Sequence, residues 1–200
     1  MPVIEIEVPD IPRKNQLELP RDKSALLIVD MQNDFAHDRG ALAGESARAI
    51  VPVIAGLLAK ARAAGVKVIF TQDWHHPGDP EFALWGEHAK AGSWGAEIIG
   101  ELSPRPEEIV LQKPRYDAFY GTPLDHLLRS WRTEHLVITG TVANICVLHT
   151  AGSAALRWYR VVIPEDAVAA LTSFDKRSAL RQITFLYRGV VTTAAGIRFT

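Results

Sequence analysis

Cys146 is the only cysteine among the 200 residues, so its thiol cannot form an internal disulfide and serves either as core filler or in chemistry. The thiolate is the reactive form; a helix N-terminus and a nearby ammonium lower the thiol pKa, and a carboxylate can accept the proton. Asp30 and Lys113 supply these groups. Taken alone, each residue has a structural interpretation: a buried thiol, an acid that caps a turn, a surface lysine. Together they predict an Asp-Lys-Cys triad.

A second group of polar residues has the composition of a metal site. Asp73 and His75 are alternate residues of an extended segment, so their side chains can point the same way, and His88 follows in the same loop. One carboxylate and two imidazoles suit zinc, iron or manganese. Histidines in loops are also commonly just solvated, so a loop without metal stays an alternative. His76 points to the other face of an extended segment and is predicted not to be a ligand.

Alternating strands and helices must position these residues. Apolar runs predict strands at 25–30, 66–73, 108–112, 135–139, 160–164 and 189–193. Helical spacing or helix-like stretches predict helices at 50–61, 122–131, 145–158 and 174–187. This pattern predicts a single-domain α/β fold: a doubly wound three-layer sandwich with a six-stranded, mostly parallel sheet. Because ligands bind beyond the carboxyl ends of such strands, the triad and Asp73 are expected at one edge.

Two segments lie outside this alternation. Residues 74–94 are rich in Trp, His, Pro and Gly and show no clear period, which favours a long functional loop. Residues 1–23 are rich in proline and charge and are predicted to be an N-terminal leader, which leaves 24–200 as the domain.

The composition restricts the class of partner and the compartment. The formal net charge is -1, so nothing favours nucleic acid or an anionic membrane, and a small molecule is the expected partner. No apolar run is long enough to span a membrane, and the N-terminus lacks the apolar core of a signal peptide. With one free cysteine, these features predict a cytoplasmic protein.

Three motifs at predicted strand ends carry a resemblance to a known family. They are Val29-Asp30-Met31-Gln32-Asn33-Asp34-Phe35, then Lys113 with Tyr116, Phe119 and Gly121-Thr122, and finally Gly140-Thr141-Val142-Ala143-Asn144-Ile145-Cys146-Val147 leading into Thr150-Ala151. From Ser24 to Thr193 the chain resembles the isochorismatase-like cysteine hydrolases, which include the nicotinamidases. The resemblance implies the isochorismatase-like hydrolase fold for 24–200.

The resemblance also assigns roles to matching residues. It puts the family triad on Asp30, Lys113 and Cys146. It implies a cis peptide between Thr141 and Val142, with the Val142 and Cys146 amides as the oxyanion hole.

Nicotinamidases carry an Asp-x-His motif and a later His preceded three positions earlier by Trp. The matching residues are Asp73, His75, His88 and Trp85. Many members add a His six positions after the first His, where this chain has Glu81, a possible further ligand. The resemblance implies a divalent metal at this site, with zinc expected and iron or manganese as alternatives. Phe35 and Trp85 match the two aromatic walls that hold a flat ring.

The expected activity is hydrolysis of a small carboxamide, nicotinamide to nicotinate and ammonia, through a Cys146 thioester. Related members cleave carbamoyl or ureido compounds with the same triad, and Glu81 could signal one of those. Other hypotheses are a metal-bound water that attacks while Cys146 is structural, a binding protein without turnover, and vinyl-ether hydrolysis, whose enzymes lack the nucleophilic cysteine and the metal triad. Family resemblance further predicts a homo-oligomer.

Overall fold

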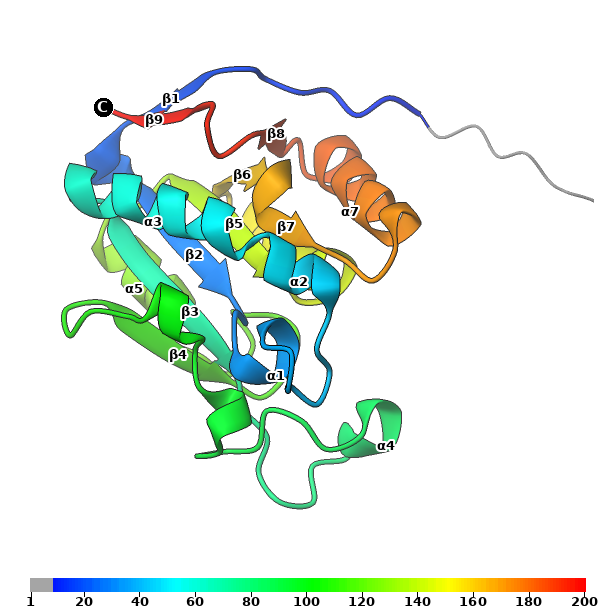
Figure 1. Cartoon of the computed structure of the whole chain (residues 1–200). Coiled ribbons are helices and arrows are strands. Elements are labelled where there is room, and N and C mark those ends of the chain that lie inside the picture. Colours follow the sequence, from blue (N-terminus) through cyan, green and yellow to red (C-terminus); the bar gives the residue numbers. More distant parts are fainter. Residues whose placement is uncertain (1–8) are drawn as a thin grey trace, which may run out of the picture.

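A parallel sheet forms the centre of the computed structural model, which describes residues 9–200. Six strands follow the order β4-β3-β2-β5-β6-β8, and every neighbouring pair is parallel (Figure 1). The strands are β2 (Ser24–Val29), β3 (Lys67–Asp73), β4 (Ile109–Lys113), β5 (His135–Thr141), β6 (Arg160–Pro164) and β8 (Val190–Thr192). A two-residue strand, β7 (Val168–Ala169), pairs with the end of β5. The predicted sheet is confirmed, with β7 as an addition.

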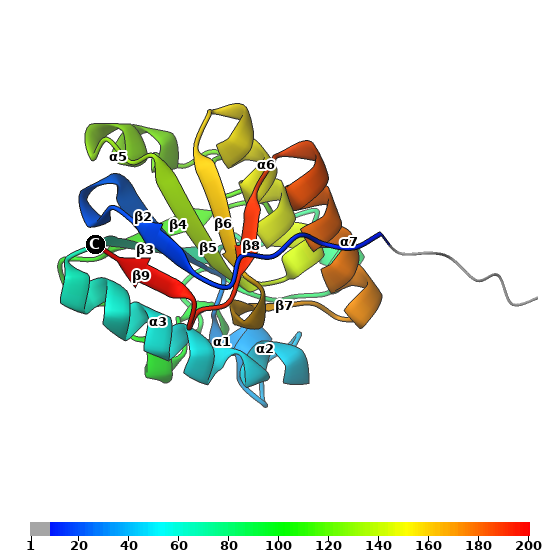
Figure 2. The same ribbon diagram turned by 90° about the horizontal axis from the view of Figure 1, so that it is seen from above.

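Helices cover both faces of the sheet and make the outer two layers. They are α2 (Glu45–Ala49) and α3 (Val51–Ala64) on one face, and α5 (Leu124–Ser130), α6 (Leu148–Leu156) and α7 (Ser173–Leu186) on the other (Figure 2). Strand β2 shows why its sequence is apolar throughout: Leu27 and Val29 pack towards α5 and α6, whereas Leu26 and Ile28 pack towards α3. A strand buried on both faces reads as a continuous apolar run. The three-layer sandwich is therefore confirmed.

The order of the strands reverses between β2 and β5. From β2 the chain adds β3 and β4 on one side, and from β5 it adds β6 and β8 on the other. In such sheets the crevice at the reversal point, beyond the carboxyl ends, is where ligands bind. Asp30 follows β2, and the turn that carries Cys146 follows β5, so both lie at this point.

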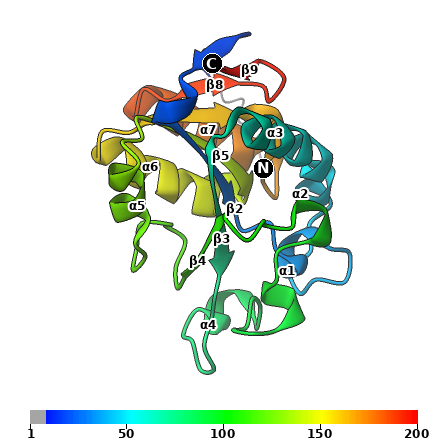
Figure 3. The same ribbon diagram turned by 90° about the vertical axis from the view of Figure 1, so that its left-hand side faces the viewer.

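Short elements lie in the segments that connect the predicted strands and helices. They are α1 (Asn33–Ala36), α4 (Phe82–Trp85) and the 3-10 turns Trp94–Ala96 and Gly100–Leu102. The loop with α4 extends beyond the ends of β3 and β4 (Figure 3). The loop is held by side-chain bonds: Gln32 Nε2 donates to the carbonyls of Asp73 (2.9 Å) and Ala96 (2.9 Å), and Asn33 Nδ2 donates to Trp94 O (2.8 Å).

The N-terminal leader predicted for residues 1–23 is described from residue 9 onward; residues 1–8 lie outside the described part. Strand β1 (Leu17–Leu19) pairs in parallel with β9 (Ile197–Phe199), and Arg13 bridges to Val191. A 3-10 turn, Arg21–Lys23, leads into β2. Another, Glu165–Ala167, joins β6 to β7. The described part of the leader thus packs against the last strands. Within residues 9–200, no helix is long and apolar enough to cross a membrane.

Gly140 allows β2 and β5 to meet where the site begins. Its φ is +108°, and a Cβ there would overlap with the carbonyl of Val29, its partner in the sheet register. Any other residue would therefore either push the two strands apart or strain the backbone.

We expect Gly140→Ala to lower the free energy of unfolding by at least about 2 kcal/mol, because both the backbone angle and the space exclude a methyl group. Denaturant unfolding followed by circular dichroism measures the change. Gly56→Ala is the matched control, since Gly56 is exposed within α3 with nothing close to its Cβ position; it should raise stability by about 0.5–1 kcal/mol. Equal effects of the two changes would contradict this account.

Candidate active site

Asp30, Lys113 and Cys146 meet at the carboxyl edge of the sheet. Lys113, the last residue of β4, is fully buried, and its Nζ lies 2.8 Å from Asp30 Oδ2 and 3.7 Å from Cys146 Sγ. Cys146 lies in a five-residue π-helical turn, Ala143–Val147, that leads into α6. The structure therefore brings the three predicted residues together, although they come from three different strand ends.

Asp30 is oriented by its neighbour on β3. Its backbone has a left-handed φ of +50°, and its Oδ1 accepts a hydrogen bond of 2.6 Å from the Thr71 hydroxyl. Thr71 Oγ1 in turn accepts from the Asp30 backbone N–H at 3.2 Å. The other oxygen, Oδ2, faces Lys113 but has no well-aligned hydrogen bond within the described chain. One carboxylate oxygen is thus fixed, and the other is free to take a proton.

Burial sets the protonation of the triad. It raises the pKa of the Asp30 carboxyl above its ordinary value; the Lys113 ammonium opposes this shift and the Asp73 charge adds to it. Burial also raises the pKa of the Cys146 thiol well above its usual range, although Lys113 pulls it down. Lys113 thus lowers this pKa as expected, but the net shift is upward, because loss of water outweighs the effect of the ammonium. The resting cysteine is a thiol beside a carboxylate with raised proton affinity.

Lys113 also contacts Asp73, the last residue of β3. Its Nζ lies 3.1 Å from Asp73 Oδ1. Although burial opposes ionisation, the Lys113 charge and the hydrogen bonds of His75 and His88 hold the pKa of Asp73 well below its usual range. Asp73 therefore shares Lys113 with Asp30 and joins the triad to the neighbouring cluster.

The peptide between Thr141 and Val142 is cis, as the resemblance implied. It lies where β5 ends and the π-helical turn of Cys146 begins. Val142 and Cys146 are both part of the pocket lining described below.

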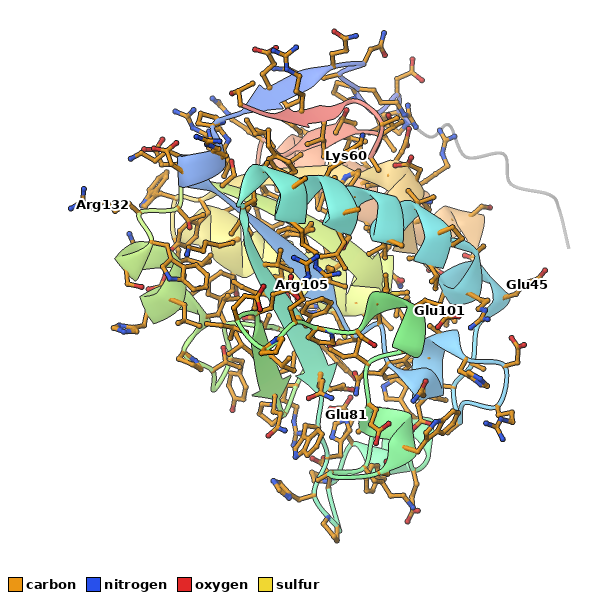
Figure 4. All side chains as sticks on the ribbon, turned by 60° about the vertical axis from the view of Figure 1, so that its left-hand side comes forward. Glu45, Lys60, Glu81, Glu101, Arg105 and Arg132 are labelled. Atoms are coloured by element: carbon orange, nitrogen blue, oxygen red, sulfur yellow. The ribbon has the colours of Figure 1, made fainter. Side chains whose placement is uncertain are left out.

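Asp73, His75, Glu81 and His88 form the second cluster. All four are buried, and one ligand atom from each lies within 4.8 Å of the other three. Glu81, labelled in Figure 4, comes from the loop before α4 at the carboxyl edge of the sheet. His76 is exposed and lies outside the cluster, in agreement with its predicted orientation.

The donors of this cluster fit a divalent metal. His75 Nε2 and His88 Nε2 face Asp73 Oδ2 at 3.0 and 3.5 Å, and His88 Nδ1 bonds to Gly86 O at 2.8 Å, which directs Nε2 inward. Glu81 Oε1 is buried without a hydrogen-bond partner in the described chain. A buried, unpartnered carboxylate oxygen among two imidazoles and another carboxylate is costly without a cation. All four residues are thus able to hold a metal.

One pocket joins the two clusters. Its volume is about 280 Å³. Its lining includes Phe35, Glu81, Trp85, His88, Val142 and Cys146. The two predicted aromatic walls therefore border the same space as the thiol, and Trp85 Nε1 donates to the Tyr116 hydroxyl at 2.9 Å across the rim. A larger groove of about 900 Å³ runs past the first residues of β5, β6 and β8, at the opposite edge, and includes none of the predicted site residues.

Sequence reasoning left several functional contacts unassigned. Thr71 orients Asp30, and Gln32 Oε1 accepts from the Asp73 backbone N–H at 2.7 Å. Asp34 holds the loop beside His88 by accepting from Ala89 N at 2.7 Å. The run of polar residues directly after a buried strand was the available signal, but a sequence does not show which backbone groups such side chains reach.

Comparison with known proteins identifies the family. The isochorismatase domain model matches residues 24–196. The chain belongs to the isochorismatase family. A curated relative, the ureidoacrylate amidohydrolase of Enterobacter sp. (strain 638), is 38% identical, and the match covers 86% of each chain.

Solved structures of this isochorismatase family are also similar. The N-carbamoylsarcosine amidase of Thermoplasma acidophilum is 38% identical with a TM-score of 0.80, over 86% of this chain and 96% of that one. The nicotinamidase of Bacillus subtilis is 34% identical with a TM-score of 0.80, over 85% of this chain and 99% of that one. The predicted family and fold are confirmed.

We expect Thr71→Val to move the acid limb of the pH profile of kcat/KM to higher pH. The Thr71 hydroxyl stabilises ionised Asp30, so its loss raises the Asp30 pKa. On lowering the pH, the variant therefore loses its active carboxylate earlier, at a higher pH than the unaltered chain. Initial rates across pH 4–8 (roughly the range in which carboxylate limbs appear) measure the shift. Thr139→Val, a buried control on β5 that bonds Leu27 O, should leave the limb in place. An unmoved limb in Thr71→Val contradicts the role of this hydroxyl.

Proposed function

We propose that this protein is a cysteine amidohydrolase that cleaves the C–N bond of a small planar carboxamide, with nicotinamide as the first candidate. The observation that carries the proposal is a single pocket that contains a thiol paired with Asp30 and Lys113 and, on another wall, a carboxylate–imidazole cluster. Phe35 and Trp85 border the same space, as expected of side chains that flank a flat ring.

In the first step, Cys146 Sγ attacks the amide carbonyl carbon while its proton passes to Asp30 Oδ2. The raised pKa of Asp30 suits this task, because a carboxylate with a higher proton affinity is a better proton acceptor. As charge leaves the carboxylate and develops on the substrate oxygen, the backbone amides of Val142 and Cys146 would stabilise the oxyanion. Lys113, which contacts both the Asp30 carboxylate and the Cys146 sulfur, keeps the two groups in place while the proton moves between them.

The tetrahedral intermediate then loses ammonia. Asp30 returns its proton to the leaving nitrogen, the C–N bond breaks, and a thioester to Cys146 remains. Asp30 next takes a proton from a water molecule that attacks the thioester carbonyl, and the acid product leaves as the thiol is reprotonated. The overall reaction consumes one water and produces one acid and one ammonia.

Asp73, His75, His88 and Glu81 would hold a divalent metal, with zinc as the first choice and iron or manganese as alternatives. When bound, this ion supplies a Lewis-acid contact for a ring nitrogen or another polar substituent of the substrate. Because Glu81 and His88 line the same pocket as Phe35, Trp85 and Cys146, a flat ring held at the metal end would place its amide end near Cys146.

A second candidate substrate is a carbamoyl or ureido compound. The relatives favour it, since the names of two similar proteins specify ureidoacrylate and N-carbamoylsarcosine. Glu81, where many nicotinamidases have His, is consistent with it as well. The same triad chemistry applies, because the scissile bond is again a carbonyl–nitrogen bond.

The proposal includes cytoplasmic location and self-association. A lone cysteine suits a reducing compartment. Large side chains such as Leu156, Trp158 and Phe185 are exposed, which supports contact with a second copy. Apart from this second copy, a small-molecule amide is the only partner proposed.

We expect Cys146→Ala to lower kcat by at least about 10³-fold while leaving bound metal per chain unchanged, because the thiol is the nucleophile and is not a metal ligand. Ammonia release and elemental analysis of the same sample measure the two quantities. Appreciable residual turnover would favour the alternative in which a metal-bound water attacks and Cys146 is structural.

A substrate panel distinguishes the two candidates. With nicotinamide, pyrazinamide, N-carbamoylsarcosine, ureidoacrylate and biuret, we expect nicotinamide to give the highest kcat/KM by ammonia release. Chelation should lower the kcat/KM for nicotinamide at least about tenfold, and added Zn²⁺ should restore it. The reason is that the metal would bind the substrate ring, whereas Cys146 supplies the nucleophile. A preference for a ureido compound that persists after chelation would overturn the nicotinamide proposal in favour of the second candidate.

A further inference from the structure

Asp79 bonds two of the four residues in the candidate metal cluster at once. It lies in the loop between β3 and α4, where its Oδ2 is 3.1 Å from His75 Nδ1 and its Oδ1 accepts from the Glu81 backbone N–H at 2.9 Å. Asp79 itself is not among the four clustered residues. Its carboxylate therefore acts on the cluster through other residues.

The bond to His75 determines which ring nitrogen faces the cluster. When neutral His75 donates from Nδ1 to Asp79, its Nε2 carries the lone pair, and this is the atom that points towards Asp73 Oδ2. The His75 side chain is fully buried, so no solvent donor or acceptor replaces Asp79 at Nδ1. Loss of the acceptor would leave a buried N–H unpaired and free the ring to change tautomer.

The bond to Glu81 fixes the start of α4. The Glu81 N–H is held by Asp79 Oδ1, and the next turn closes with Trp85 N donating to Glu81 O at 3.2 Å. Because both the N–H and the C=O of Glu81 are hydrogen-bonded, its backbone is fixed and its carboxylate is directed inward. There, Oε1 is buried without a hydrogen-bond partner in the described chain. Asp79 thus orients an oxygen donor as well as a nitrogen donor.

Arg115 anchors Asp79 from another element. Its Nη1 lies 3.0 Å from Asp79 Oδ2 and 3.8 Å from Glu81 Oε2. Arg115 comes two residues after Lys113, so the same stretch of chain supplies the triad cation and the anchor of the loop. Its charge offsets that of Asp79 and limits the build-up of negative charge beside the cluster.

We propose that Asp79, held by Arg115, is the positioning residue of the metal site: one carboxylate sets the tautomer of His75 and the placement of Glu81. This inference rests on the metal part of the proposed function. Its test measures metal affinity, which does not depend on the substrate or on Cys146.

We expect Asp79→Ala to lower the Zn²⁺ affinity of the metal-free full chain at least about tenfold, since loss of such supporting contacts typically costs 10- to 100-fold. Competition with a chromophoric chelator measures it. The absorption spectrum of bound Co²⁺ should also change, because the donor geometry changes. Arg115→Gln should give a smaller loss in the same direction.

Glu87→Ala is the matched control. Glu87 is an exposed acid in the same loop, paired with exposed Lys90 at 2.9 Å, and its loss should change Zn²⁺ affinity less than about twofold. Thermal unfolding of the metal-free variants separates misfolding from lost affinity. If Asp79→Ala does not fold, Asp79→Asn, which keeps one acceptor oxygen, should still lower the affinity at least about threefold.

The positioning role would be overturned if folded Asp79→Ala lost less than about tenfold in Zn²⁺ affinity, or if Asp79→Asn, where that variant replaces it, lost less than about threefold. A loss of Zn²⁺ affinity in Glu87→Ala equal to that in the Asp79 variant would also overturn it. Failure of the unaltered chain to bind Zn²⁺, Fe²⁺ or Mn²⁺ would overturn it together with the metal part of the proposed function. Hydrolysis by Cys146 would then still be judged by its own variant, so the two failures are distinguishable.

Discussion

The ammonium of Lys113 is buried between the carboxylates of Asp30 and Asp73, and both halves of the site depend on it. Without Lys113, two buried carboxylates at adjacent strand ends would repel each other. Removing one partner of a buried ion pair typically costs about 3–5 kcal/mol of stability. The single charge of Lys113 attracts both carboxylates, and its ammonium still reaches the thiol. With one cation between two anions, a further negative charge on Cys146 is disfavoured, and the thiol gives up its proton only as the substrate accepts the electrons.

The sheet makes this arrangement possible because its strand order reverses between β2 and β5. Asp30 and the turn of Cys146 flank the crevice at the reversal, and β3 and β4 add Asp73 and Lys113 on one side. Gly140 lets the two central strands approach where a side chain would prevent it. Polar side chains that follow the strands then hold the long loop, so a segment without periodic structure still presents buried, oriented donors.

Much of the fold could be predicted because the signals are local. The buried run that ends at Asp30 and the helical spacing after residue 50 each follow from the side chains themselves, and alternation of such elements permits few topologies. The short elements α1, α4 and β7 were not predicted, since they are held by long-range bonds such as Gln32 to Asp73 rather than by propensity. The cis peptide before Val142 was implied by resemblance alone.

The sequence by itself determined which residues could act: one thiol, the acids and the lysine at strand ends, and an Asp-x-His pair with a later histidine. Residue type and strand periodicity suffice for that. Only the tertiary structure decided their electrostatic state and their supports. The thiol pKa is raised rather than lowered because burial depends on the whole surrounding fold. Asp79 and Arg115 took on a role only when folding put Arg115 against Asp79 and Asp79 against His75. Arg115 and Asp79 are 36 residues apart, and the step from His75 to Asp79 lies in a loop without periodic structure, so neither contact leaves a local pattern.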